Sequence, residues 1–429
     1  MAAPPGPDGR IWALAIETRP QTQISIWDIG RTRCKWVDNV SGGDARCGHW
    51  AQGAIADFDM MAAVVMTWER SLELWDLRQL GRPVASTQKG IIGPPGAALR
   101  ATPLGQEQPR ALCGGKGGDI LVFELSGEGG ELHLLKTLSG HAELVKWAEV
   151  DWGEDVRLAS LAIDGEVRIW EFHLDEYEDI ELLPRKVHAP REKFRTMQDM
   201  HPKTLPAGGK FRTRAAVFER RPSDEHTCAV TGSHEGLLHF WRYNCNGTWV
   251  LPETDNSPLH GHTDEISAVC AEFKTGRYMS ASLDRTLRIW ETALDGSNVR
   301  CEAVLEGHAS SVRVLLADFK ADRALSAGED ETAHVWDIRR AKEHPEEADR
   351  GMGALPVPGV LREALVSFPS GHAAGVTREG ALCVWDLQQM ERIAQVSSHA
   401  GATFAVQIGG GGGGPGACTG GSGWAHSSW

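Results

Sequence analysis

The sequence lacks several features that would define other classes of protein. Its longest apolar run, Met60 to Met66, has seven residues, whereas a spanning helix needs about 20. The first ten residues, MAAPPGPDGR, have neither a basic start nor an apolar segment, so no signal peptide is expected. The nine cysteines are irregularly spaced without a CxxC pair, which predicts reduced thiols. A net charge of −14 argues against general nucleic-acid binding.

One pattern does recur, about every 47 residues: alternating apolar residues that end in an aromatic residue, usually followed by an acid. Alternation with a period of two predicts a strand, and turn residues six positions before the aromatic predict a hairpin. The 3.6-residue period of helical repeats is missing, so the pattern predicts an all-β protein. The closing aromatics are Trp27, Trp75, Phe123, Trp170, Trp241, Trp290, Trp336 and Trp385, with a degraded copy at Trp429.

A Gly-His dipeptide precedes several of these aromatics, as in Gly261-His262, which lies 28 residues before Trp290 when counted from the histidine. With the Trp-Asp-like endings, this resembles the WD40 repeat over nearly the whole chain, which implies a β-propeller of four-stranded blades. The resemblance also implies a tetrad in which Asp orients His, His meets a Ser hydroxyl, and Ser meets the indole N–H. The expected tetrads are His141, Ser160, Asp164 and Trp170; His262, Ser280, Asp284 and Trp290; and His308, Ser326, Asp330 and Trp336.

Serine, histidine and aspartate are also the parts of a hydrolase triad. A triad occurs once per active site, whereas this set recurs with tryptophan as a fourth member, so a structural role is favoured. Other repeats are incomplete: Thr231 and Glu235 replace Ser and Asp before Trp241, and Gly117 takes the Asp position before Phe123. We expect these blades to be held mainly by packing.

The two ends of the chain leave the number of blades open. The first repeat lacks an innermost strand, and the last ends at Trp429 without an outermost one. If residues 31–40 supply that outer strand, the repeats ending at Trp75 through Trp429 make eight blades and residues 11–28 are left over. Seven blades with spare repeats, or part of a longer two-propeller protein, explain the surplus equally. One propeller domain over residues 1–429, with eight blades favoured, is the prediction.

Residues 171–210 form a charged insertion, because the step from Trp170 to Trp241 is 71 residues long. Residues 171–183 hold six acids and no base, whereas residues 185–214 hold nine Lys or Arg and two acids. Two interpretations stay open. The insertion is a solvated loop whose halves neutralise each other, or it docks an acidic or phosphorylated partner. The second interpretation rests on Arg191, Lys193 and Arg195.

Two closing aromatics continue into arginine, as Trp-Asp-x-Arg, at Arg78 and Arg339. This motif resembles the signature of propellers that serve as substrate receptors of cullin-4 ubiquitin ligases, where the arginine helps to dock the adaptor protein. The alternative is structural: the stem of each arginine packs over its strand and the head caps the loop.

Other chemical motifs are weak. The glycine-rich Gly114–Asp119 segment lacks the order of a phosphate-binding loop and lies between predicted strands. Strand alternation scatters His226, His234 and His239 around one hairpin, so no metal site is assigned there. We therefore expect no cofactor, no metal and no catalytic residue.

The predicted function is a non-catalytic scaffold, cytoplasmic or nuclear, that binds other proteins. A propeller holds variable loops on a rigid frame. The alternatives are a ubiquitin-ligase receptor acting through Arg78 and Arg339, and a propeller enzyme, for which no singular polar cluster stands out. By resemblance, the binding face carries the turns at Trp68, His234, Leu283, Glu329 and Arg378.

Overall fold

The computed structural model contains two compact units, Met1–Met61 together with Lys210–Trp429, and Ala62–Gly209. Each is described by itself. The structure describes residues 11–17, 23–30, 33–36, 51–57, 60–67, 70–78, 83–87, 92, 99–102, 108–115, 117–125, 132–152, 155–162, 167–173, 195–196, 213–219, 227–243, 249–250, 260–292, 299–344, 351–397, 403–408 and 424–425.

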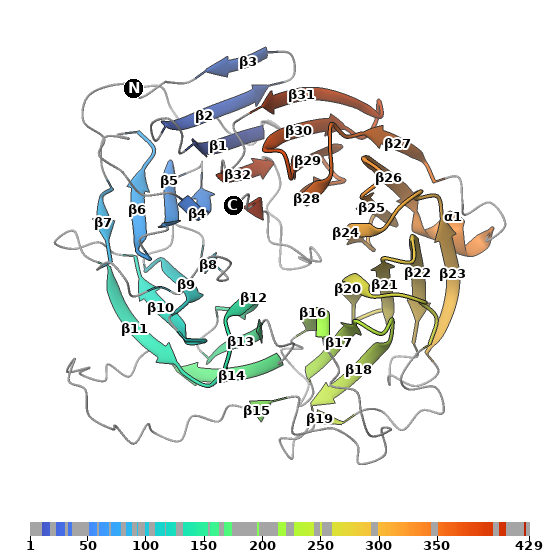
Figure 1. The fold of residues 1–429 in the computed structure, drawn as a ribbon, viewed down its shortest axis with the longest axis horizontal. Coiled ribbons are helices and arrows are strands. Elements are labelled where there is room, and N and C mark those ends of the chain that lie inside the picture. The colour runs from blue at the N-terminus through green and yellow to red at the C-terminus, as the bar shows by residue number, and fades with distance from the viewer. Residues whose placement is uncertain are drawn as a thin grey trace. The chain divides into compact units, whose positions relative to one another are not determined.

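Strands dominate, as the sequence predicts. The described residues form eight antiparallel sheets, seven with four strands and one with five, and they include a single short helix. Figure 1 shows the strands following one another as successive hairpins. These observations confirm the all-β class and the four-stranded sheets.

In the unit Ala62–Gly209, the sheets are β8-β9-β10-β11, β12-β13-β14-β15 and part of β4-β5-β6-β7. The boundary between the units falls between β4 and β5. The strands are β5 (Ala62–Thr67), β6 (Leu72–Asp76), β7 (Ala85–Ser86), β8 (Leu99–Ala101), β9 (Arg110–Gly114), β10 (Ile120–Glu124), β11 (His133–Leu138), β12 (Val145–Asp151), β13 (Asp155–Ala162), β14 (Val167–His173) and β15 (Arg195–Thr196).

The predicted charged insertion, residues 171–210, overlaps this unit, and a few of its residues are in strands. Strand β14 continues beyond Trp170 to His173, because the alternation of VRIWEFH does not stop at the tryptophan. Strand β15 pairs with it, placing Arg195 opposite Ile169. Residues 171–173 and 195–196 therefore belong to a sheet. The remainder of residues 171–210 lies outside the described residues.

The other unit contains the remaining sheets. Its first strands lie beside one another, β16 next to β20, β20 next to β24, and β24 next to β28 (Figure 1). Its elements are β1 (Ile11–Glu17), β2 (Gln23–Gly30), β3 (Arg33–Trp36), β4 (Ala51–Asp57), β16 (Thr213–Glu219), β17 (Thr227–Ser233), β18 (Leu238–Tyr243), β19 (Trp249–Val250), β20 (Ile266–Glu272), β21 (Arg277–Ser282), β22 (Thr286–Glu291), β23 (Arg300–Glu306), β24 (Val312–Asp318), β25 (Arg323–Gly328), β26 (Thr332–Asp337), α1 (Ile338–Glu343), β27 (Gly353–Pro356), β28 (Leu361–Ser367), β29 (His372–Thr377), β30 (Ala381–Asp386), β31 (Glu391–Ser397), β32 (Thr403–Ile408) and β33 (Trp424–Ala425).

The ends of the chain share one sheet, of order β3-β2-β1-β32-β33. Strand β32 pairs antiparallel with β1, with Ile11 opposite Ile408. The missing inner strand of the first repeat is thus β32. The expectation that residues 11–28 stand outside the repeated sheets is wrong, because β1 and β2 share this sheet with β32. Residues 33–36 pair with β2 in this same sheet instead of completing the last repeat. The apolar alternation of TFAVQI suits an inner position beside β1.

The closing aromatics are core residues wherever their side chains are described. Trp170, Trp336 and Trp385 are each 1% exposed. In the cluster between the sheets β20–β23 and β24–β27, Trp336 packs with Met279 and Ile289 of the neighbouring sheet. Truncating such a side chain to alanine typically costs about 3–5 kcal/mol. The repeated aromatic therefore joins neighbouring sheets.

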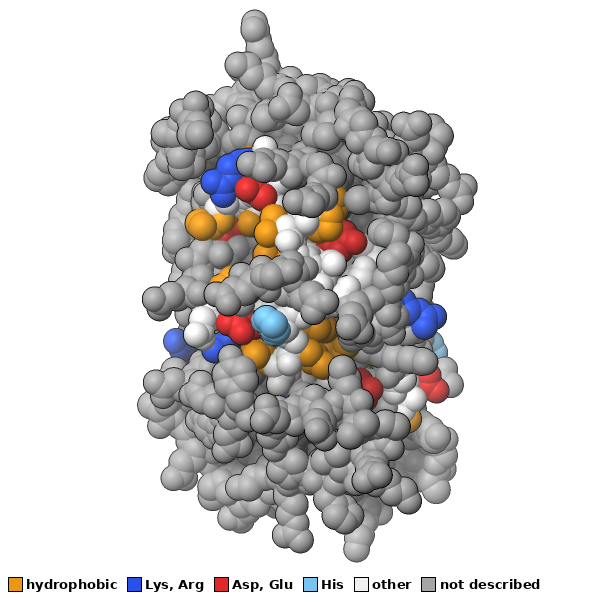
Figure 2. All heavy atoms as spheres, turned by 90° about the vertical axis from the view of Figure 1, so that its left-hand side faces the viewer, with side chains coloured by type: hydrophobic (Ala, Val, Ile, Leu, Met, Phe, Trp, Pro, Cys, Tyr) orange, Lys and Arg blue, Asp and Glu red, His pale blue; other side chains and the backbone are white. Residues whose placement is uncertain are grey.

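The surface of the described residues is mixed. Figure 2, viewed from the left-hand side of Figure 1, shows small groups of apolar side chains separated by charged and polar ones. Isolated exposed apolar residues such as Val84, at 52% exposure, are ordinary on protein surfaces. On this side, the described residues do not present one dominant apolar patch.

Candidate functional site

Two tetrads are complete among the described residues. In the first, His262 Nδ1 lies 2.8 Å from Asp284 Oδ2 and Nε2 lies 2.8 Å from Ser280 Oγ. Trp290 Nε1 donates to the same Ser280 oxygen at 2.8 Å. Each polar atom of the buried chain thus has a partner within the sheet.

The next sheet repeats this geometry. His308 Nδ1 lies 2.8 Å from Asp330 Oδ2, and Nε2 lies 2.7 Å from Ser326 Oγ. Trp336 Nε1 donates to Ser326 Oγ at 2.8 Å. Both tetrads join the loop before the first strand, the second strand, the following turn and the third strand of one sheet.

A third set is partly described. Ser160 Oγ lies 2.7 Å from His141 Nε2 and accepts the indole N–H of Trp170 at 2.8 Å. The fourth expected member, Asp164, lies outside the described residues. In repeats without the tetrad, the indole N–H has other acceptors: Trp75 donates to Glu73 Oε2 and Trp385 to the Pro356 carbonyl.

The charges in the tetrads fit an orienting role. Burial would raise the pKa of Asp284, but hydrogen bonds and attraction from His262 and hydrogen bonds from Thr286 outweigh it, so the pKa lies well below its usual range. Burial lowers the pKa of His308, against the opposing effect of Asp330. Ser280 and Ser326 are 0% exposed, so a substrate cannot reach either hydroxyl. The geometry favours structural tetrads over hydrolase triads.

The glycine of the Gly-His dipeptide has a steric explanation. A Cβ added at Gly261 would lie 2.8 Å from Trp290 Cη2. At Gly140 it would lie 2.4 Å from Arg168 Nη1 and 3.1 Å from the indole of Trp170. At Gly261 the loop therefore approaches the closing aromatic too closely for a Cβ, whereas at Gly140 the flexible end of Arg168 and the indole of Trp170 would have to shift.

The turns between the second and third strands form what we call the turn face, residues 234–236, 283–285, 329–331 and 378–380. Backbone hydrogen bonds fix these turns to the starts of first strands. The N–H of Leu283 donates to Glu265 O at 2.9 Å, that of Glu329 to Ser311 O at 2.9 Å, and that of Arg378 to Val360 O at 2.8 Å.

Neighbouring sheets are linked along the turn face. Ser311 Oγ donates to the Leu283 carbonyl at 3.3 Å, from one sheet to the preceding one. His234 Nδ1 lies 2.6 Å from Glu265 Oε2, again between adjacent sheets. The side chain of Glu329 accepts two hydrogen bonds from Arg313, at 3.0 and 2.9 Å. The turns are therefore held in fixed relation to one another.

The last residue of each turn has left-handed backbone geometry. Gly236 has a φ of 77° and Arg285 a φ of 74°. A Cβ at Gly236 would lie 2.8 Å from the carbonyl oxygens of both Asp264 and His262, so this glycine fits closely against the Gly-His loop of the next sheet. Turn and tetrad loop thus support each other across the sheet boundary.

The structure describes some of the predicted binding residues on this face. His234 and Arg378 are exposed, and Leu283 and Glu329 are half-buried. Trp68, Arg191 and Lys193 lie outside the described residues, and of Arg195 only the backbone in β15 is described.

Beside the turn face lie residues that the sequence analysis missed, Glu265, Ser311 and Arg313. They stand at or just before the start of a first strand, a few residues after the Gly-His dipeptide. That fixed spacing could have identified them. In an antiparallel pair the start of the first strand lies beside the end of the second, as with Ile266 and Ser282, so these residues lie at the same edge as the turns.

The two Trp-Asp-x-Arg arginines are on the surface. The Arg78 side chain is 64% exposed, with Nε 3.0 Å from Asp76 Oδ1. Arg339 is the second residue of α1, its side chain is 71% exposed, and it forms an ion pair with Glu343 at 2.9 Å. It lines a groove of about 610 Å³ together with Ala321, Asp322, Arg323, Asp337, Arg340, Glu343 and His344.

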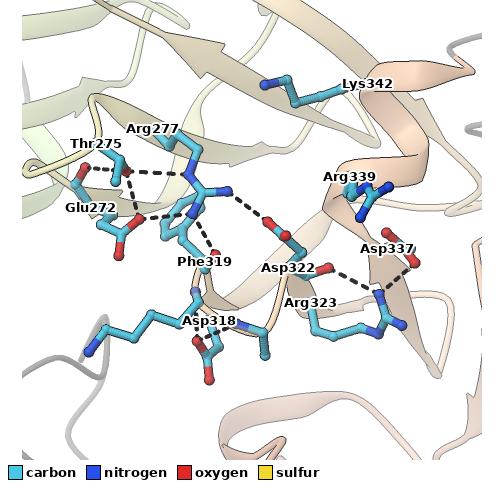
Figure 3. A network of polar contacts seen from close by, with 12 residues as sticks. Glu272, Thr275, Arg277, Asp318, Phe319, Asp322, Arg323, Asp337, Arg339 and Lys342 are labelled. Atoms are coloured by element: carbon cyan, nitrogen blue, oxygen red, sulfur yellow. Dashed lines mark hydrogen bonds and ion pairs between the residues drawn. The ribbon is translucent and has the colours of Figure 1, made fainter. Parts of the chain in front are cut away.

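Beside this groove, Arg277 joins two sheets, as Figure 3 shows. Its Nη1 lies 2.7 Å from Asp322 Oδ1 in the next sheet, and its Nη2 lies 3.0 Å from Glu272 and 2.5 Å from the Phe319 carbonyl. Arg323 pairs with Asp337 at 2.5 Å in the same region. Most acids here already have a cationic partner within the unit.

Comparison with known sequences gives a family. The sequence model of the family described as "WD domain, G-beta repeat" matches residues 254–291 and 299–337. These segments contain the two complete tetrads. No curated protein matches the sequence.

A solved structure is similar in fold. The computationally designed Ika8 protein is 17% identical, with a TM-score of 0.54, and the alignment covers 85% of this chain and 90% of that one. At this identity the likeness concerns the fold alone. Among the described residues, no helix has the length and apolarity needed to span a membrane.

Proposed function

The chain belongs to the WD-repeat family, and from this premise we propose that it is a non-catalytic scaffold that binds other proteins through the turn face. Domains of this family commonly mediate protein–protein interactions and are generally non-catalytic. The supporting observation is the set of hydrogen bonds that holds the turns of successive sheets at one edge. Such a surface is organised before a partner binds, which lowers the entropic cost of association.

The side chains offered there differ from sheet to sheet. His234 and Arg378 are exposed, and Glu235, Glu331 and Glu379 beside the same turns are exposed as well. A partner would therefore contact a different charged or polar group at each sheet. Such a surface favours specific recognition over simple charge attraction. Affinity purification would identify that partner.

We would compare two charge-reversal variants of the full chain by affinity purification from cells and mass spectrometry. The test variant carries Glu235→Lys, Glu331→Lys and Arg378→Glu on the turn face. The control carries Lys274→Glu and Lys320→Glu, exposed positions in turns at the opposite edge of the same strands. We expect the test variant alone to lose partners. Equal retention of partners by both variants would contradict the proposal.

A second candidate function is the ubiquitin-ligase receptor, favoured by the exposed Arg339 at the groove beside α1. The double variant Arg78→Ala, Arg339→Ala should then lose an adaptor protein without unfolding. The matched control is Arg300→Ala, which removes another exposed arginine that pairs with an acid, Glu302. Recovery of the same partners from both proteins would leave the two arginines as structural residues of their loops.

A further inference from the structure

His334 occupies a position where equivalent repeats carry arginine. In the sheets with a tetrad, the residue paired with the tetrad serine is Arg168 opposite Ser160 and Arg288 opposite Ser280. In the third such sheet, His334 is opposite Ser326. This exchange replaces a permanent cation with an imidazole, which in its neutral form can bind a metal.

The imidazole lies among other metal-ligand groups. The rings of His308 and His334 are 4.4 Å apart in an edge-to-face arrangement, and His334 stacks on Trp336. His334 Nε2 lies 3.1 Å from Thr332 Oγ1, which donates to Asp330 Oδ1 at 2.7 Å. One ligand atom from each of His308, Asp330 and His334 lies within 4.8 Å of the other two.

We propose that His308, Asp330 and His334 form a binding site for a zinc-class divalent metal ion in this repeat. Two imidazoles and a carboxylate are a donor set that zinc accepts, with a fourth position for water. His308 Nδ1 and Asp330 Oδ2 are 2.8 Å apart, a hydrogen-bond distance, and they would have to separate to about 3.3 Å to bind one tetrahedral ion. A small movement of the His334 side chain would bring one of its ring nitrogens within bonding distance of the same ion.

The protons in the site must rearrange when the ion binds. Without metal, His308 Nδ1–H donates to Asp330 and Ser326 O–H donates to His308 Nε2. With metal on Nδ1, the imidazole proton moves to Nε2 and donates to Ser326 Oγ, which also accepts from Trp336, while the hydroxyl proton turns away. No proton is released, because His308 stays neutral.

Burial limits what a bound ion could do in this site. The His308 side chain is 0% exposed, so the ion would stabilise the repeat and would not act on a substrate.

The test is titration of the untagged full chain with Co²⁺ and then Zn²⁺, followed by absorption and thermal unfolding. The control variant His334→Arg restores the residue of the equivalent repeats and keeps the tetrad of His308. Wild type should show visible bands of four-coordinate Co²⁺ without thiolate charge transfer, displaced by one equivalent of Zn²⁺. His334→Arg should weaken binding by more than the roughly 10- to 100-fold that loss of an outer-shell partner costs.

A gain-of-site variant makes the test independent of any damage in the control. Arg288→His places an imidazole opposite Ser280, beside the His262–Asp284 pair of the other complete tetrad. It should add a second equivalent of bound metal and a further rise in unfolding temperature. The proposal is overturned if wild type and His334→Arg bind Co²⁺ equally, or if wild type binds none.

Discussion

Arg277 Nη1 lies 2.7 Å from Asp322 Oδ1 and so connects the sheet β20–β23 to the sheet β24–β27. The Arg277 side chain is 21% exposed and also bonds Glu272 and a carbonyl group. We expect Arg277→Met to lower the free energy of unfolding by about 1–2 kcal/mol, because half-buried acceptors lose a charged donor.

The measurement is chemical denaturation of both proteins followed by tryptophan fluorescence. Arg339→Ala is the control, since its ion pair with Glu343 is exposed and should add no measurable stability. If both variants unfold at the wild-type denaturant concentration, Arg277 does not stabilise the boundary between these sheets.

Removing a tetrad hydroxyl should be costly despite the small change in volume. Ser280→Ala leaves the indole N–H of Trp290 and Nε2 of His262 without their buried partner. We expect a loss of about 2 kcal/mol in the free energy of unfolding. Ser370→Ala, which removes a hydroxyl bonded only three residues away along the chain, should change it by less than about 0.5 kcal/mol. A comparable loss of unfolding free energy in both variants would show that the tetrad hydroxyl stabilises the fold no more than the hydroxyl of Ser370 does.

The tetrad aspartate should make stability depend on acid. The pKa of Asp284 is lowered in the folded protein, so its stabilisation is fully present above the ordinary carboxyl range, near pH 4, and is lost as pH falls through the folded-state pKa. Asp284→Asn should therefore cost about 2 kcal/mol at pH 7 and less at pH 3. Unfolding titrations at both values test this, with Ser370→Ala, which removes no titratable group, as the reference. A difference that stays constant with pH would reject the charge-based explanation.

Two substitutions at the same turn position should have opposite effects. Gly236→Ala puts a side chain on left-handed backbone and 2.8 Å from two carbonyl oxygens, so we expect a loss of at least about 1–2 kcal/mol. Arg285→Gly relieves a left-handed non-glycine residue with a φ of 74° and should gain up to about 1 kcal/mol. Thermal unfolding of the two single variants checks the signs. Changes of the same sign would mean that backbone geometry is not what distinguishes these positions.

Local patterns explain how much of the fold could be predicted. The aromatic that ends each third strand and the Gly-His dipeptide are short-range signals, and they correctly placed the sheets around Trp290 and Trp336 and the residues that form hydrogen bonds there. The pairing of β1 with β32 joins distant segments, and alternation alone does not say which strands are partners. The sequence pattern therefore wrongly predicts that residues 11–28 lie outside the sheets of the repeats.

The candidate site was predictable only in part for the same reason. Turn residues such as His234 and Arg378 follow directly from the repeat. The salt bridge between Arg313 and Glu329 depends on two segments meeting at one edge. His334 passed unnoticed because its meaning depends on which residue faces the tetrad serine in the other sheets, a comparison that needs the strand register.

The pairing of Ile11 with Ile408 also means that β1 stays without its partner strand during most of the synthesis of the chain. At about 5–20 residues per second, β32 leaves the ribosome roughly 20–80 s after β1. Until then the edge of β1 that β32 covers has unpaired backbone groups, which can recruit strands of other chains. Exposure to aggregation during translation is therefore governed by the length of chain between these two strands, and stronger pairing within the finished sheet would not shorten it.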